Sequence, residues 1–69
     1  MPTLGEQRVR LDFNPSGDTR VDVFKQLTAQ LIDHCELMKS QGKDARLCAL
    51  AQTAYEEAAM WAVKAATSP

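Results

Sequence analysis

The chain turns back on itself at residues 40–44, S-Q-G-K-D, which separate two long stretches of helical periodicity. Gly42 suits the end of a first helix, because glycine readily adopts the left-handed conformation found there, and Asp44 suits the N-cap of a second. A connection this short joins neighbouring helices in antiparallel fashion. We therefore predict an all-α helical hairpin, with helices at residues 19–41 and 44–66.

Apolar side chains recur every three or four residues in both helices, as in amphipathic helices that bury one face. The row on the first helix contains Val21, Phe24, Thr28, Leu31, Cys35 and Met38, widened by Leu27 and Ile32. The second helix carries two adjacent rows: Leu47, Leu50, Ala54, Ala58 (or Glu57), Trp61 and Ala65 in one, and Cys48, Ala51, Tyr55, Ala59, Ala62 and Ala66 in the other. From residue 58 to residue 63 this helix is apolar all round, which predicts burial on every side.

The chain has 69 residues, and a core of that size is marginal without disulfides, metals or partner subunits. One hairpin partner cannot cover a helix that is apolar all round. We therefore expect a homo-oligomer whose centre is formed by the second helices, with Met60 and Trp61 at the subunit contacts. The alternative is a monomer in which the N-terminal arm folds back over these two residues.

An N-terminal arm and turn, residues 1–18, precede the hairpin, and we expect a single domain over residues 1–69. Thr3 and Glu6 have the spacing of a capping box, so a short helix is expected to start at Thr3, although Gly5 weakens it. The alternating pattern of residues 8–13 allows either a frayed helix end or an extended arm. Residues 14–18, N-P-S-G-D, form a dense turn signal, and Asp18 or Thr19 can cap the next helix.

Charge and cysteine content argue against several classes of protein. The net charge is −1 with the two signs interleaved, which argues against duplex nucleic acid as a partner. No apolar stretch reaches the roughly 20 residues of a membrane span. The N-terminus does not resemble a secretory signal, so we expect a reducing cytoplasm and interpret Cys35 and Cys48 as free, buried thiols, with a single disulfide as the alternative.

The sequence contains no catalytic or metal-binding constellation. His34, the one histidine, is adjacent to Cys35, and adjacent helical residues point apart. Cys48 has no zinc-ligand spacing. Glu56 and Glu57 are neighbours rather than a facing acid–base pair, and we interpret Glu56 as part of a solvated face. We therefore expect no enzymatic activity, no metal and no cofactor.

The remaining candidate chemistry surrounds the arm and the turn. Arg8, Arg10 and Phe13 precede the turn, and Lys25 lies early in the first helix. A helix N-terminus with nearby cations attracts phosphate, and an aromatic ring offers a nucleobase a stacking surface. Together these parts suit a nucleotide. The alternative interpretation places Phe13 in the core and both arginines in solvent.

Two segments carry a family resemblance: residues 4–10, L-G-E-Q-R-V-R, leading into residues 13–16, F-N-P-S, and residues 51–65, A-Q-T-A-Y-E-E-A-A-M-W-A-V-K-A. By these segments the chain resembles the phage anti-CBASS sponges for cyclic oligonucleotides, whose helical-hairpin domain is shared with anti-Thoeris sponges. The resemblance implies a hexamer, a trimer of dimers, in the cytoplasm of the infected bacterial host. It implies sequestration without hydrolysis of cyclic dinucleotides between paired subunits (such as cyclic GMP-AMP, cyclic di-AMP and cyclic di-GMP) and of trinucleotides (such as cyclic tri-AMP) where three subunits meet.

The resemblance also implies site residues. The family's dinucleotide pocket uses an aromatic residue near the end of the arm and a lysine early in the first helix, which Phe13 and Lys25 match. Phe13 and Asn14 stand where better-known members have tyrosine and arginine, so stacking is kept but a hydroxyl contact is lost. Lys64 matches the arginine of the trinucleotide site, keeping the charge without the bidentate fork.

Arg8 and Arg10 have no counterpart in the family motif, and with Asn14 they complete the candidate dinucleotide-binding residues. Two other functions stay open at this point. One is an oligomeric helical adaptor that binds a host protein, and the other is a sponge for the cyclic ADP-ribose signals of Thoeris defence.

Overall fold

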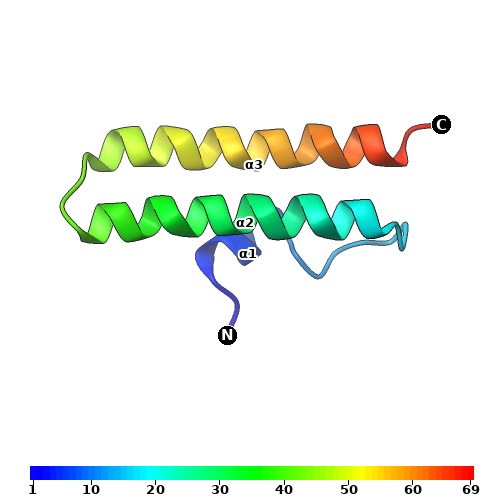
Figure 1. The fold of residues 1–69 in the computed structure, drawn as a ribbon, viewed down its shortest axis with the longest axis horizontal. Coiled ribbons are helices and arrows are strands. Elements are labelled where there is room, and N and C mark those ends of the chain that lie inside the picture. Colours follow the sequence, from blue (N-terminus) through cyan, green and yellow to red (C-terminus); the bar gives the residue numbers. More distant parts are fainter.

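The computed structural model describes residues 1–69 and contains three helices, α1 (Leu4–Val9), α2 (Thr19–Ser40) and α3 (Ala45–Thr67). Helices α2 and α3 run antiparallel along most of the molecule, and α1 packs against α2 near its middle (Figure 1). The predicted all-helical hairpin is confirmed. Gln41 and Asp44 are cap residues outside the helices, so α2 ends and α3 begins one residue from the expected bounds.

Local hydrogen bonds define the helix ends. At the start of α1 the Glu6 amide donates to Thr3 Oγ1 at 3.1 Å, and the Thr3 amide donates to Glu6 Oε1 at 2.7 Å, which is the expected capping box. At the end of α2, Gly42 has a φ of 86° and donates its amide to the Lys39 carbonyl at 3.1 Å. Glycine adopts this backbone conformation without a Cβ clash, which lets the chain reverse direction before Asp44 caps α3.

Gly5 allows α1 to lie directly on the backbone of α2. A Cβ atom on Gly5 would stand 2.0 Å from the Ala29 carbonyl oxygen, so only glycine fits without movement. The Gly5 amide donates to Asp33 Oδ1 at 2.7 Å, a hydrogen bond to a charged acceptor that attaches the start of α1 to α2. The same glycine that weakens α1 as an isolated helix therefore positions the arm.

The buried face of α2 differs from the row that periodicity predicted. Phe24, Leu27, Leu31 and Met38 were expected in the core and are exposed, so the prediction was wrong for these residues. The reason is that α2 has two neighbours, and its buried face lies between α3 and α1. At 100° per residue the exposed row lies on the side of α2 opposite Ala29 and Asp33, which contact α1. The buried residues of α2 are Val21, Lys25, Ala29, Ile32 and Cys35.

Helix α3 presents the second of its two predicted rows to α2, with Cys48 and Ala59 buried. Gln52, 1% exposed, lies in the same interface and is satisfied because its amide donates to the Ile32 carbonyl and to Glu36 Oε1, each at 3.1 Å. The first row stays uncovered, and Leu47, Leu50 and Trp61 are all more than half exposed. A single hairpin therefore leaves apolar rows bare on both α2 and α3.

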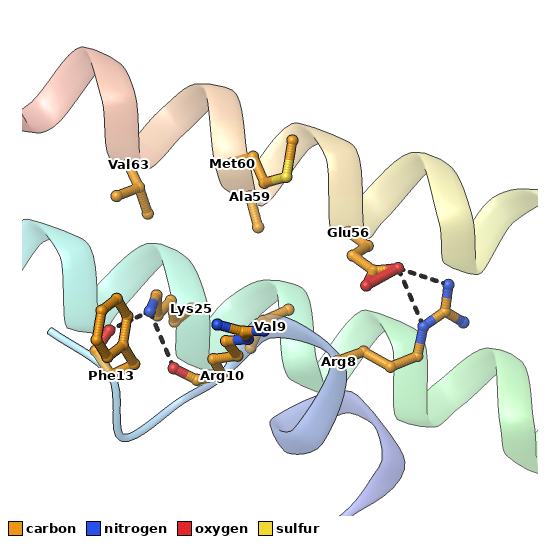
Figure 2. A pocket seen from close by; sticks show the side chains of 9 residues that line it. All are labelled: Arg8, Val9, Arg10, Phe13, Lys25, Glu56, Ala59, Met60 and Val63. Carbon is orange, nitrogen blue, oxygen red and sulfur yellow. Dashed lines mark hydrogen bonds and ion pairs between the residues drawn. The ribbon is translucent and has the colours of Figure 1, made fainter.

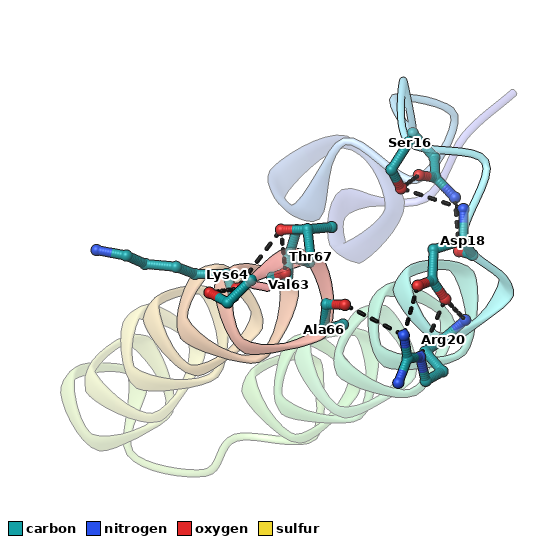
Figure 3. A network of polar contacts seen from close by, with 9 residues as sticks. Ser16, Asp18, Arg20, Val63, Lys64, Ala66 and Thr67 are labelled. Atoms are coloured by element: carbon teal, nitrogen blue, oxygen red, sulfur yellow. Dashed lines mark hydrogen bonds and ion pairs between the residues drawn. The ribbon is translucent and has the colours of Figure 1, made fainter.

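Arg20 joins the open end of the hairpin, where α2 begins and α3 ends (Figure 3). Its guanidinium donates to the Ala66 carbonyl at 3.2 Å and to Asp18 Oδ2 at 2.8 Å. The hydrogen bond from Arg20 also lowers the pKa of the Asp18 carboxyl. In this end-on view the arm lies on one side of the two long helices, and the opposite side carries no other segment.

Candidate functional site

A groove of about 460 Å³ runs between the arm and α3, above the first turns of α2 (Figure 2). Its volume falls within the range of small-molecule sites, about 300–1,000 Å³. It gathers four of the candidate residues from separate parts of the chain. We call it the arm groove, and it is lined by Arg8, Val9, Arg10, Phe13, Lys25, Glu56, Ala59, Met60 and Val63.

Phe13 is 60% exposed and lies at one end of the arm groove. The alternative that it belongs to the core is therefore excluded. Lys25 Nζ lies 5.4 Å from the centre of its ring, within cation–π range. The exposed ring offers an aromatic surface beside positive charge, which is the combination that a nucleotide requires.

Lys25 is only 7% exposed, and its ammonium is hydrogen-bonded to the backbone of the arm. It donates to the Arg10 carbonyl at 2.9 Å and also to the Phe13 carbonyl. Burial lowers the pKa of Lys25 because the charged form loses water, an effect that Asp22 opposes and Arg10 reinforces. The lysine thus holds the arm against α2 at the base of the groove.

Arg8 forms an ion pair across the groove with Glu56 of α3. Arg8 Nη2 and Nε lie 2.8 Å and 3.2 Å from Glu56 Oε2, as the dashed lines in Figure 2 show. The interpretation of Glu56 as a solvated residue was wrong, because the folded arm brings a guanidinium to it. This pair links the arm to α3 and neutralises one of the groove's cations.

Arg10 has a side chain without a hydrogen bond or an ion pair, and it lines the arm groove (Figure 2). It also lines a second, more open hollow of about 560 Å³ on the outer side of the arm, which it shares with Phe13. We call this the outer hollow; it is lined by Met1, Pro2, Glu6, Gln7, Arg10, Leu11, Asp12 and Phe13. Arg10 and Phe13 therefore separate two concave surfaces and face both.

Asn14 and the start of α2 lie away from the arm groove. Asn14 Nδ2 donates to the Asp18 carbonyl at 2.9 Å and to Asp22 Oδ1 at 3.0 Å, which closes the turn. The N-terminus of α2 is capped by Asp18, whose carboxylate accepts the Arg20 amide at 2.8 Å. The structure does not bring this helix end to the arm groove, because a carboxylate caps it and no residue from 14 to 24 lines the groove.

Lys64 lies in the last turn of α3, outside the arm groove. Its Nζ atom is 5.4 Å from the centre of the Trp61 ring. Figure 3 shows the side chain extending away from α2 and from the arm. Lys64 and the arm-groove cations thus belong to two separate surfaces of the chain.

Four groove residues of α3 were not among the candidate binding residues: Glu56, Ala59, Met60 and Val63. Spacings of three and four residues within this set place its members on one face of the helix. The spacing alone could have grouped them, but only the position of the arm shows that this face borders a groove.

The structure holds no group of three or more histidine, cysteine or acidic side chains placed to bind a metal ion. His34 is exposed on α2, whereas Cys35 is buried, so the two do not act as a pair. None of the three helices is both long and apolar enough to cross a membrane.

The fold and the groove together define a small helical-hairpin protein with an aromatic and cationic binding surface. A family model described as Acb2/Tad1, hairpin domain, matches residues 5–67, nearly the whole chain. The chain therefore belongs to this family, the anti-CBASS and anti-Thoeris sponges, which are binders of cyclic oligonucleotide signals rather than enzymes. Comparison with curated proteins and with solved structures gave no match.

Proposed function

We propose that this chain is a phage anti-defence sponge that binds cyclic dinucleotides and trinucleotides and blocks CBASS signalling without hydrolysing them. The observation that carries the proposal is the arm groove, in which an exposed aromatic ring and three cations meet within the matched family domain. A cyclic dinucleotide has two phosphates and two bases, so it needs both kinds of partner. The protein would act in the cytoplasm of the infected bacterial host.

The dinucleotide would occupy the arm groove, with a base stacked on Phe13 and a phosphate beside the arm's arginines. Base–aromatic stacking is worth about 1–3 kcal/mol, and each hydrogen bond to a charged group about 1.5–3 kcal/mol. Several such contacts reach the roughly −12 kcal/mol of nanomolar binding. Asn14 is left out of this site, because its amide is engaged in the turn.

The functional unit would be a homo-oligomer, with a hexamer built as a trimer of dimers. Two observations support a second copy of the chain as the occupant of the bare apolar rows. Phe24, Leu31, Leu50 and Trp61 are each at least 40% exposed, and a chain of 69 residues has little other apolar surface to bury. A ligand with two-fold or three-fold character also suits symmetric subunit contacts.

Cyclic trinucleotides would bind at a separate site that includes Lys64. This lysine is exposed and does not line the arm groove, so copies from three subunits could approach one ligand without occupying the dinucleotide site. Lys64→Ala is expected to weaken capture of cyclic tri-AMP and to leave capture of cyclic dinucleotides unchanged. Equal loss of both ligands would contradict the separation of the sites.

The decisive experiment is calorimetric titration of the purified protein with a panel of cyclic GMP-AMP, cyclic di-AMP, cyclic di-GMP, cyclic tri-AMP and cyclic ADP-ribose isomers. A sponge binds members of the panel and returns them intact when the protein is heat-denatured. Recovery of a linear product would identify a nuclease instead. Binding restricted to the cyclic ADP-ribose isomers would identify a sponge for Thoeris signals.

The bare apolar rows favour one second candidate, an oligomeric adaptor that binds a host protein. An adaptor would be silent across the whole nucleotide panel. The variant Lys25→Ala is informative in addition, because the sponge predicts that dinucleotide capture is lost while the mass of the assembly persists. Unchanged capture in this variant would refute the arm groove as the binding site.

A further inference from the structure

The three cations of the arm groove differ in the hydrogen bonds and ion pairs that their charged groups already form. Arg8 is paired with Glu56 through two of its nitrogens. Lys25 is buried, with its ammonium donating to two carbonyl oxygens of the arm. The side chain of Arg10 has no partner. Arg10 is therefore the only one of the three whose N–H donors are all uncommitted.

We propose that Arg10 is the phosphate-binding residue of the arm groove and that Lys25 is a positioning residue that holds the arm around it. This assignment rests on the proposed nucleotide-binding function and gives the two cations different roles within the same site. It reverses the simplest expectation, in which the lysine contacts the ligand and the arginine is a solvated surface residue.

The backbone of Arg10 supports the assignment. Arg10 is the only residue other than glycine with a positive φ, at 53°; the other two such positions are Gly17 and Gly42. A side chain in this left-handed conformation is strained, and glycine is the usual residue at the end of a helix that closes in this way. Strained residues of this kind concentrate at functional sites. The strain places an unpaired guanidinium between the arm groove and the outer hollow.

The contacts of Lys25 explain how the strained conformation is kept. Its ammonium donates to the carbonyl of Arg10 itself and to that of Phe13, so it bridges the two residues that border both hollows. Since the amine is buried beneath them, a ligand in the groove meets the guanidinium before it meets the ammonium. Charge repulsion from Arg10 also lowers the pKa of Lys25, although the nearby Asp22 carboxylate opposes this with a larger effect, so the two positive charges lie close together.

The arrangement of Arg10, Phe13 and Lys25 fits a ligand that carries a phosphate group. A guanidinium can bind two phosphate oxygens at once, whereas the Lys25 ammonium already donates two of its three N–H groups to carbonyl oxygens. The exposed Phe13 ring, which lines the same two hollows as Arg10, gives the base of the same ligand a stacking surface. Arg10 and Phe13 would thus bind the two halves of one nucleotide, with Lys25 fixing their relative position.

The test compares Arg10→Gln with Arg46→Gln, using cyclic GMP-AMP as the titrant. Arg46 is an exposed arginine in the first turn of α3 that lines neither hollow and has no ion pair, so its variant is a matched control for charge. Arg10→Gln is expected to weaken binding by about 10- to 150-fold, and Arg46→Gln by less than about two-fold. Equal affinities for Arg10→Gln and the wild-type chain would overturn the assignment of Arg10 as the phosphate-binding residue but not the sponge function. Silence of the wild-type chain across the nucleotide panel would overturn the sponge function as well.

Two further variants separate contact from positioning. Arg10→Gly is expected to lose binding while keeping a Tm equal to or above that of the wild-type chain, because it relieves the strain. Lys25→Met is expected to lower the Tm, to accelerate amide hydrogen exchange at Phe13 and to weaken binding together with that loss of order. The Phe13 amide is informative because it donates to the Arg10 carbonyl at 2.9 Å. A Lys25→Met variant that loses binding with an ordered arm and an unchanged Tm would show that the lysine contacts the ligand directly and would refute its positioning role.

Discussion

Replacing Gly5 by alanine is expected to destabilise this protein, even though alanine is the better helix former. Gly5 lies in the first turn of α1, where alanine would contribute up to about 1 kcal/mol of helix propensity. The contact with α2 acts in the opposite direction. A Cβ atom would stand 2.0 Å from the Ala29 carbonyl oxygen, so α1 must move away by about 1 Å to restore even a tight contact.

The displacement of α1 decides how much stability the Gly5→Ala variant loses. The hydrogen bond from the Gly5 amide to Asp33 Oδ1 is 2.7 Å long, and a displacement of about 1 Å stretches it beyond the useful range. A hydrogen bond to a charged group contributes about 1.5–3 kcal/mol. After the gain in helix propensity is subtracted, the free energy of unfolding should fall by about 1–2 kcal/mol, which lowers the Tm of a chain of this size by about 4–16 °C.

The assay combines thermal unfolding at a fixed protein concentration with amide exchange at Leu11, which donates to the Glu6 carbonyl at 3.0 Å where α1 closes. Gly17→Ala is the control, because Gly17 has a positive φ but open space around it. The control should lose about 1–2 kcal/mol from backbone strain while protection at Leu11 persists. A Gly5→Ala protein with undiminished Tm and a protected Leu11 amide would refute the argument from close packing.

Three further outcomes follow from the structure. Trp61→Asp should reduce the mass of the assembly measured by light scattering, because the ring is 59% exposed in one hairpin; an unchanged mass would contradict its place at a subunit contact. Glu56→Gln removes the partner of Arg8, so dinucleotide affinity should rise while stability falls by at most about 1 kcal/mol; weaker binding would show that the ion pair shapes the groove. Hydrogen bonds from Gln52 and Lys39 hold the pKa of Glu36 below its ordinary value, so its stabilisation is present above about pH 4.3 and is lost as the pH falls through the lower folded value. Denaturant unfolding of Glu36→Gln between pH 6 and 3 should therefore show a weaker loss of stability with acid than the wild-type chain, and an identical loss would exclude the contribution.

The sequence predicted most residues of the candidate site, but it did not predict which partners each of them contacts. Arg8, Arg10, Phe13 and Lys25 were all named as candidates, and the fold brings all four to one groove. Their partners were not foreseeable, because they come from α3 and from the backbone of the arm. Glu56 is the clearest example, since a carboxylate on a helix face is ordinarily solvated until another segment places a guanidinium beside it.

Local chemistry determined the elements of this protein. The capping pair Thr3 and Glu6, the caps Asp18 and Asp44 and the glycine at residue 42 act within a few residues of themselves, so the sequence alone predicts three helices and an antiparallel hairpin. The family domain is likewise visible in the order of the residues.

Tertiary packing decided which face of each helix is buried. Periodicity shows which side chains share a face of a helix. Because both α1 and α3 pack on α2, the buried face of α2 lies between them, which leaves Leu31 exposed and Lys25 buried. A lysine is tolerated in the interior only because two carbonyl oxygens of the arm replace its water, and those oxygens reach it only once the arm has folded. That dependence on distant partners is the physical reason why the groove could not be derived from one segment of the sequence.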